Sequence, residues 1–260
     1  MPAVNEAPLL SIVVPIRNMQ GRLGEARNWL AQVKEFDMEV IFVNDASVDE
    51  TFTELTKIVQ ENKYEFVKNF DGIFGGPGPA RNFGMSKSKG EWIAFWDSDD
   101  EPNVPIFFEM VQSADLKSRD IAVGGWTAKQ IHSNQEELSH VEKSHNPKFY
   151  DILVSPGIWR WAFKLELAKK STFPDILMGE DLVFLANLKL SPRFQYNKNV
   201  YTYVQGNPGQ LTSSKRALQD RKNMRVHLTR DIFGDQLDLL KVMLRAKIRV
   251  SSFWHGVRNE

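Results

Sequence analysis

The stretch L-L-S-I-V-V-P, residues 9–15, is a near-continuous apolar run that is rich in β-branched residues. Such a run is typical of a parallel strand that is buried on both faces. A second run of this kind, E-V-I-F-V at residues 39–43, follows a segment whose apolar residues recur at steps of three and four between Leu23 and Val33. That spacing favours a helix. The order of strand, helix and strand, with a further helical stretch at 50–61, predicts an α/β sheet.

The alternation continues further along the chain. An extended segment is expected at residues 64–70, then the loop G-I-F-G-G-P-G-P, a helix at 80–89 and a strand at 92–96. The glycines of the loop do not form a dinucleotide fingerprint, because Arg81 stands where the third glycine is required. The loop also follows the third strand instead of the first. No P-loop pattern occurs in the sequence, so both of these nucleotide sites are excluded.

The composition is that of an enzyme-sized chain with no overall charge preference. Its 260 residues include 33 basic and 33 acidic side chains, so nothing in the balance favours nucleic acid as a partner. The chain has no cysteine, which excludes disulfides and thiolate metal sites. The sequence shows neither the features of a signal peptide nor the run of roughly 18 apolar residues that a membrane span needs. We therefore expect a cytoplasmic protein.

Polar residues follow three of the expected strands. They are P-I-R-N at residues 15–18, N-D-A-S at 44–47 and D-S-D-D at 97–100. Ligands of open α/β sheets bind beyond the carboxyl ends of the strands, so we expect these three sets to share one site. An alternative remains open for the second set, because Asn, Asp and Ser are also preferred residues at the beginning of a helix.

Residues 92–102, W-I-A-F-W-D-S-D-D-E-P, run from an apolar strand directly into a cluster of acidic residues. Carboxylates gathered at the mouth of a buried strand repel one another unless a cation neutralises them, so this segment predicts a metal site. An EF-hand is excluded, because Pro102 and Phe108 stand where that loop requires a glycine and a bidentate glutamate. What remains is a site for Mg²⁺ or Mn²⁺ with few protein ligands and room for the phosphates of a substrate.

Five segments together resemble the family 2 glycosyltransferases of the GT-A fold, in that family's order and approximate spacing. They are S-I-V-V-P-I-R-N, V-N-D-A-S-V-D-E-T, P-A-R-N-x-G, F-W-D-S-D-D-E-P and M-G-E-D-L-V-F-L. The likeness extends from Ser11 to about Leu190. It implies an α/β fold with a Rossmann-like mixed central sheet flanked by helices. We expect a catalytic domain at 1–205, with a nucleotide-sugar half at about 9–102 and an acceptor half at about 103–205, and a C-terminal helical extension at 206–260.

The resemblance also implies how the chain binds a nucleotide-sugar donor. Asp97 is expected to face the ribose, and Asp99 to coordinate the Mn²⁺ or Mg²⁺ that bridges the diphosphate. Arg81 is expected to reach the base or the phosphates. Asp45 as an acceptor suits the N–H of uracil, which favours a UDP-sugar. The residues expected to bind the donor are Pro15, Arg17, Asp45, Arg81, Asp97 and Ser98.

The acidic pair Glu180-Asp181 opens an apolar stretch far from the first half of the site. The resemblance implies that this pair is catalytic and that Asp181 removes the proton from the attacking hydroxyl, so that a single displacement inverts the anomeric centre. The alternative is that both acids only complement the dipole of a helix. On the acceptor side, Trp126, Trp159 and Arg160 are the candidates, since Trp suits the apolar face of a sugar ring. Core packing is the alternative for the tryptophans.

The stretch at residues 236–254 alternates apolar and basic residues and predicts an amphipathic helix. Such a helix lies at a membrane interface, packs on its own domain or forms a homodimer contact. The predicted function is therefore an inverting, metal-dependent glycosyltransferase, cytoplasmic or peripheral at the inner face of the membrane, that extends a surface glycan or a lipid-linked oligosaccharide. A sugar-phosphate nucleotidyltransferase and a non-catalytic carbohydrate-binding protein are the alternatives.

Overall fold

The computed structural model describes residues 7–130, 157–188 and 193–206. Within these ranges the strands form one mixed sheet in the order β3-β2-β1-β4-β7-β6-β8-β5. The strands are β1 (Leu10–Ile16), β2 (Met38–Asp45), β3 (Val67–Gly72), β4 (Trp92–Phe95), β5 (Glu101–Pro102), β6 (Ile121–Gln130), β7 (Trp161–Lys164) and β8 (Phe194–Gln205). The helices are α1 (Gly24–Val33), α2 (Thr51–Glu61), α3 (Pro77–Lys87), α4 (Val104–Leu116), the 3₁₀ helix η1 (Ile158–Arg160), α6 (Leu165–Ala168) and α7 (Glu180–Ala186).

Strands β1 and β2 form the centre of the parallel part of the sheet. β1 pairs in parallel with β2 on one side and with β4 on the other, and β2 pairs in parallel with β3. Every residue of β2 is buried, as are all residues of β1 except Pro15. The predictions of two buried parallel strands from the apolar runs at 9–15 and 39–43 are confirmed, because only strands covered on both faces favour unbroken apolar sequence.

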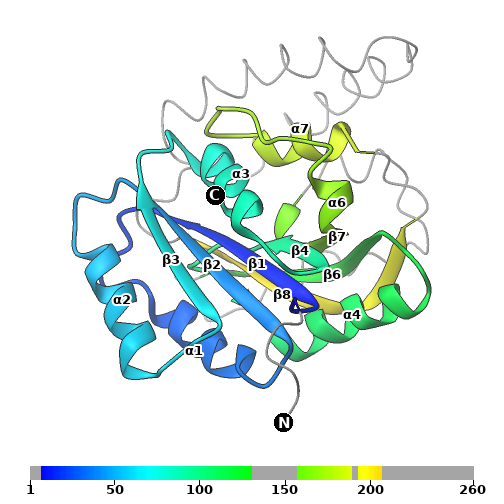
Figure 1. Cartoon of the computed structure of the whole chain (residues 1–260), viewed down its shortest axis with the longest axis horizontal. Coiled ribbons are helices and arrows are strands. Elements are labelled where there is room, and N and C mark those ends of the chain that lie inside the picture. The colour runs from blue at the N-terminus through cyan, green and yellow to red at the C-terminus, as the bar shows by residue number, and fades with distance from the viewer. Residues whose placement is uncertain (1–6, 131–156, 189–192, 207–260) are drawn as a thin grey trace, which may run out of the picture.

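Helices cover both faces of this sheet (Figure 1). Figure 1 shows α3, α6 and α7 on one side and α1, α2 and α4 on the other, and two apolar clusters fill the two interfaces. The first cluster includes Trp29, whose ring stacks on Phe42 of β2 at 5.8 Å. The second includes Phe95, whose ring meets the edge of Phe173 at 4.9 Å. The α/β class and the mixed, helix-flanked sheet expected from the sequence are therefore confirmed.

The element boundaries differ from the sequence-based expectation by one to three residues, and the two largest differences are at the beginnings of β3 and α3. Strand β3 begins at Val67, not at residue 64, because the N–H of Tyr64 still bonds to the carbonyl of Val59 at the end of α2, at 3.1 Å. Helix α3 begins at Pro77, not at residue 80. The N–H groups of the first turn of a helix have no acceptor within the helix, so proline, which lacks an N–H, is tolerated there. Pro77 and Pro79 therefore belong to the first turn of α3 instead of preceding it.

The C-terminal helix expected at 236–254 lies outside the described residues. In the described part of the chain, no helix combines the length and the apolar character that crossing a membrane requires.

Helix α3 packs closely on β1, and Gly84 makes this possible. A Cβ at Gly84 would overlap the Cγ1 of Val13, and the Cγ2 and Cβ of this fully buried side chain are also close. We expect Gly84→Ala to lower the free energy of unfolding by about 1–3 kcal/mol, the usual cost of overpacking a core. Urea unfolding measures this change. Ser86→Ala, at an exposed position of the same helix, is the control, and equal midpoints for the two variants would contradict the prediction.

Candidate active site

The polar residues that follow β1 and β2 lie together at the carboxyl edge of the sheet. Nη1 of Arg17 lies 3.3 Å from Oδ2 of Asp45. The backbone N–H of Asn18 donates to Oγ of Ser47 at 2.9 Å, and Oδ1 of Asn18 accepts from the N–H of Val48 at 3.0 Å. Parallel strands end at the same edge, so residues far apart in the chain meet there. The first two polar sets therefore share one place, as expected.

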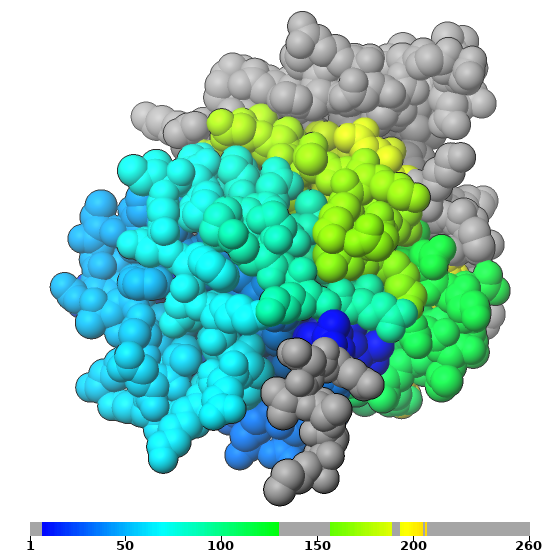
Figure 2. Space-filling model, viewed as in Figure 1, coloured from blue at the N-terminus to red at the C-terminus, as the bar shows by residue number. Residues whose placement is uncertain are grey.

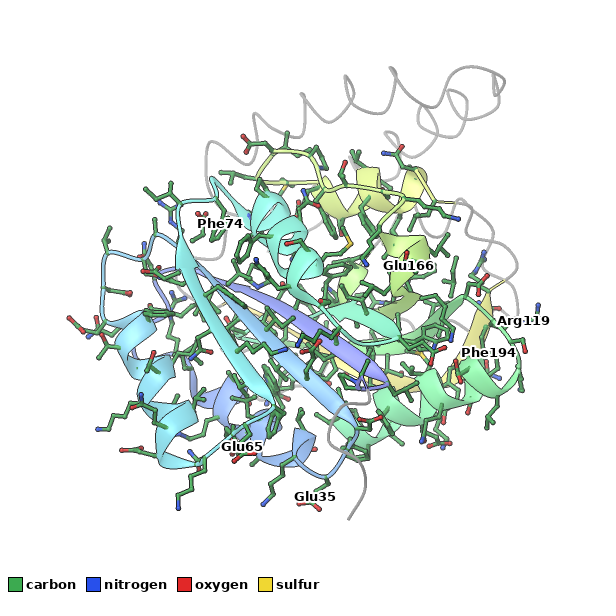
Figure 3. The ribbon with its side chains drawn as sticks, viewed as in Figure 1. Glu35, Glu65, Phe74, Arg119, Glu166 and Phe194 are labelled. Atoms are coloured by element: carbon green, nitrogen blue, oxygen red, sulfur yellow. The ribbon has the colours of Figure 1, made fainter. Side chains whose placement is uncertain are left out.

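Asp45 organises the loop that leaves β3. Its Oδ1 accepts the N–H groups of Phe74 at 2.6 Å and of Gly75 at 3.0 Å, and the residue is only 3% exposed. Figure 3 labels Phe74 in this loop, at the opposite end of β3 from Glu65. Asp45 does not cap a helix: α2 begins after Glu50, and no side-chain cap is formed there. The alternative role as a helix cap is therefore wrong, whereas a contact with a nucleobase stays a prediction.

Strand β8 holds the acidic loop that follows β4. The N–H of Asp97 donates to Oη of Tyr201 at 3.0 Å, and Oδ1 of Asp100 accepts the N–H of Val204 at 2.8 Å. The next residue, Glu101, belongs to β5, which pairs antiparallel with β8. The side chain of Asp100 is therefore buried. Burial, and next the negative charge of Asp97, raise the pKa of Asp100 well above the ordinary range of an aspartate. Asp100 therefore supports the fold of the acidic loop.

Asp97 and Asp99 are half-buried, while Ser98, which lies between them, is only 4% exposed. Among the described residues, no group of three or more acidic or histidine side chains is placed to hold a metal ion. A pair of hard oxygen donors nevertheless fits Mg²⁺ or Mn²⁺, which usually keep several water or phosphate ligands beside one or two carboxylates. The residues present thus fit a divalent cation whose remaining ligands come from a diphosphate.

Arg81 joins the acidic loop to the distant acidic pair. Its Nη2 lies 2.9 Å from Oδ1 of Asp97, and its Nη1 lies 2.7 Å from Oε1 of Glu180, which is 99 residues further along the chain. The guanidinium lies 5.6 Å from the centre of the Phe173 ring, and Arg81 is 4% exposed. Burial lowers the pKa of Arg81, but the charges of Asp97 and Glu180 outweigh it and raise that pKa. A permanent cation therefore lies between two carboxylates.

Glu180 and Asp181 form the first turn of α7, where the structure places them beside Arg81. Burial raises the pKa of Glu180 to about 7, against the opposing charge of Arg81. Burial also raises the pKa of Asp181, Arg81 opposes this shift, and Asp97 adds to it. Oδ1 of Asp181 accepts the N–H of the adjacent Leu182 at 2.7 Å. A carboxylate whose pKa is raised toward neutrality is the better general base.

The aromatic residues expected on the acceptor side pack on one another. Trp159 stacks on Tyr201 at 4.6 Å and on Tyr203 at 5.8 Å, and meets the ring of Trp126 at 5.2 Å. Trp159 is 9% exposed and Arg160 is fully buried, whereas Trp126 is half-buried. Core packing therefore accounts for Trp159. An acceptor contact stays a prediction for all three candidates, and Trp126 is the most accessible of them.

Sequence reasoning missed two residues that build the site. Tyr201 supports Asp97 through its hydroxyl, although the sequence showed only an aromatic residue in an extended stretch. Asn82 exchanges two hydrogen bonds with the backbone of Phe173. Its place directly after Arg81 in P-A-R-N was a usable signal, because a polar side chain next to a site residue often positions its neighbours through hydrogen bonds.

The sheet and its carboxyl edge define a protein of the GT-A fold, and solved structures with that fold share the architecture. TarS of S. aureus, residues 1–349 in complex with UDP-GlcNAc, has a TM-score of 0.65 at 21% identity, covering 85% of this chain and 67% of that one. The mannosyltransferase PcManGT of Pyrobaculum calidifontis, in complex with GDP-Man and Mn²⁺, has a TM-score of 0.57 at 17% identity, covering 86% of this chain and 62% of that one.

The family model of glycosyl transferase family 2 matches residues 11–174, and the chain belongs to this family. A poly(ribitol-phosphate) beta-glucosyltransferase of Bacillus spizizenii is 31% identical over 71% of this chain and 30% of its own length. A GalNAc(5)-diNAcBac-PP-undecaprenol beta-1,3-glucosyltransferase of Campylobacter jejuni is 24% identical over 81% of this chain and 70% of its own length. The chain spans less than two thirds of the length of the first curated relatives that it matches.

Proposed function

We propose that the chain transfers a sugar from a nucleoside diphosphate sugar, a UDP-sugar by preference, to a hydroxyl of a surface glycan or a lipid-linked oligosaccharide. The observation that carries this proposal is the Arg81 bridge. It joins the half-exposed Asp97-x-Asp99 pair, which suits a donor diphosphate, to the turn that bears Asp181. The names of the Bacillus and Campylobacter relatives support the acceptor class, and the UDP-GlcNAc in the TarS complex supports the donor.

The proposed reaction is a single displacement. The acceptor hydroxyl oxygen attacks the anomeric carbon, its proton passes to Asp181, and the bond from the anomeric carbon to the diphosphate oxygen breaks with its electron pair on the diphosphate. One attack from the opposite face inverts the anomeric centre. A divalent cation held at Asp99 would neutralise the leaving diphosphate. Asp97 faces the ribose in this arrangement, and Arg17 and Asp45 lie toward the base.

The experiment is a UDP-release assay on the purified chain. We expect release of UDP from at least one UDP-sugar in the presence of Mn²⁺, a faster release when a glycan acceptor is added, and loss of release with EDTA. A thermal-shift screen of nucleotide sugars guides the choice of donor, since a ligand that binds only the folded state stabilises it. A sugar-phosphate nucleotidyltransferase would instead release pyrophosphate from a nucleoside triphosphate. A carbohydrate-binding protein would release neither product, and either result would refute the proposal.

A further inference from the structure

We propose that the segment P-G-P-A-R-N, residues 77–82, is an internal docking site that positions the turn bearing Asp181, with Arg81 and Asn82 as its positioning residues. The inference deepens the proposed function and rests on it. Helix α3 carries this segment, and residues 173–180 form the stretch that docks on it. In Figure 2 the cyan atoms of α3 border the yellow-green atoms of that stretch and of α7.

Asn82 holds the beginning of the docked stretch. Its Nδ2 donates to the carbonyl of Phe173 at 2.8 Å, and its Oδ1 accepts the N–H of the same residue at 2.9 Å. A primary amide is the side-chain group that both donates and accepts in this way, so Ala or Asp at this position would break at least one of the two bonds. The pair joins residues 91 positions apart, and it therefore fixes tertiary structure, not a local turn.

Gly78 allows the close approach. A Cβ at this position would lie 2.5 Å from the carbonyl oxygen of Pro174, 3.2 Å from Cβ of Phe173 and 3.5 Å from Cβ of Glu180. Residues 173–180 thus approach α3 closely at Gly78. A larger residue would push the stretch, and with it Glu180, away from the site.

Arg81 holds the end of the docked stretch. Its Nη1 bonds to Glu180 and its Nη2 to Asp97. The guanidinium therefore sets the distance between the turn that bears Asp181 and the acidic loop that follows β4. Lysine offers a single ammonium group and lacks the rigid planar fork that reaches two carboxylates at once. Because the guanidinium is buried with both Nη atoms engaged, direct binding of a donor would require these bonds to break. Arg81 therefore acts through the carboxylates that it holds.

The first test separates positioning from donor binding. We expect Arg81→Lys and Asn82→Ala each to lower kcat for UDP release with acceptor by about 10- to 100-fold, because misplacing a reacting group by about 1 Å costs up to that much. Asn82→Ala should change the KM for the donor by less than about threefold, because its two hydrogen bonds join it to the backbone of Phe173 and not to the acidic loop. In Arg81→Lys the loss in kcat should exceed any change in that KM, since Arg81 also holds Asp97. Lys87→Met, at an exposed position of the same helix, is the matched control and should keep wild-type values. Circular dichroism establishes that each variant is folded.

The second test uses the pH profile, which a purely structural role would leave in place. Asp181 faces Arg81 of α3, Asp97 of the acidic loop and its neighbour Glu180. The cationic Arg81 favours the ionised form of Asp181, so Arg81→Met should raise the pKa of Asp181. The acid limb of the kcat profile should therefore move to higher pH. Asn82→Ala changes no charge and should lower kcat without moving the limb.

The inference is overturned if Arg81→Lys raises the donor KM and keeps kcat, since Arg81 would then bind the donor directly. It is also overturned if both substitutions leave kcat unchanged in an active enzyme. Failure of the wild-type chain to release UDP would instead refute the proposed function and the inference with it. If Arg81→Met does not fold, Asn82→Ala and Arg81→Lys still decide the outcome, because neither removes a charge.

Discussion

Asp181→Asn should lower kcat for sugar transfer by about 10²- to 10⁴-fold, the range over which a positioned general base accelerates a reaction. Asparagine keeps the shape of the side chain but does not accept the hydroxyl proton. Asp181 does not belong to the donor-binding residues, so the donor KM should stay within about twofold, and the loss should appear in kcat. Steady-state UDP release with a glycan acceptor measures both constants.

The matched control for this substitution is Asp175→Asn. Asp175 is exposed and lies in the same stretch before α7, so the change has the same chemistry without a reacting proton. Asp175→Asn should keep wild-type kcat. The wild-type pH profile gives a second check: since burial raises the pKa of Asp181, activity should fall as the pH drops through that raised pKa, with the base protonated below it. An Asp181→Asn enzyme that transfers sugar within a few-fold of wild type would exclude Asp181 as the base.

Local sequence patterns predicted the parts of the site that lie at strand ends. The buried strands β1, β2 and β4 follow from unbroken apolar runs, and parallel pairing brings their carboxyl ends to one edge. The pattern of apolar runs is therefore enough to predict that the residues at the ends of these strands lie at one edge of the sheet. Arg17 and Asp45 meet for this reason, and Asp97 begins the acidic loop at the same edge.

Long-range contacts were beyond this reasoning. Nothing in the sequence near Tyr201 indicates that its hydroxyl supports Asp97, because the pairing of β8 with β5 and β6 joins distant segments. The two hydrogen bonds between Asn82 and the backbone of Phe173 likewise join distant segments, so the sequence around either residue does not predict them. The resemblance to a family predicted that Arg81 and Glu180 belong to one site, but not that they touch. Direct contact depends on how closely Gly78 lets two segments approach, and only packing decides that distance.

Asp99→Ala should abolish metal-dependent donor binding and lower kcat/KM by about 10³-fold, since a divalent cation supplies several kcal/mol of charge stabilisation to a leaving diphosphate. Asp99 is a half-exposed carboxylate in the loop that follows β4, two positions after Asp97. A donor at about 100 times its Kd stabilises the wild-type chain by about 2.7 kcal/mol, and this stabilisation should need Mn²⁺. In Asp99→Ala it should vanish.

The thermal-shift comparison distinguishes a binding defect from damage to the fold. Asp99→Ala should unfold at the wild-type temperature without ligand, because removing one half-exposed carboxylate from an acidic cluster relieves repulsion as much as it removes contacts. Asp120→Ala, an exposed acidic position away from this edge, should retain the full Mn²⁺-dependent shift. If Asp99→Ala kept that shift as well, the cation would be held elsewhere, and the acidic loop would serve the ribose and the fold alone. The dependence on Asp99 therefore decides whether the carboxylate pair after β4 is a metal site.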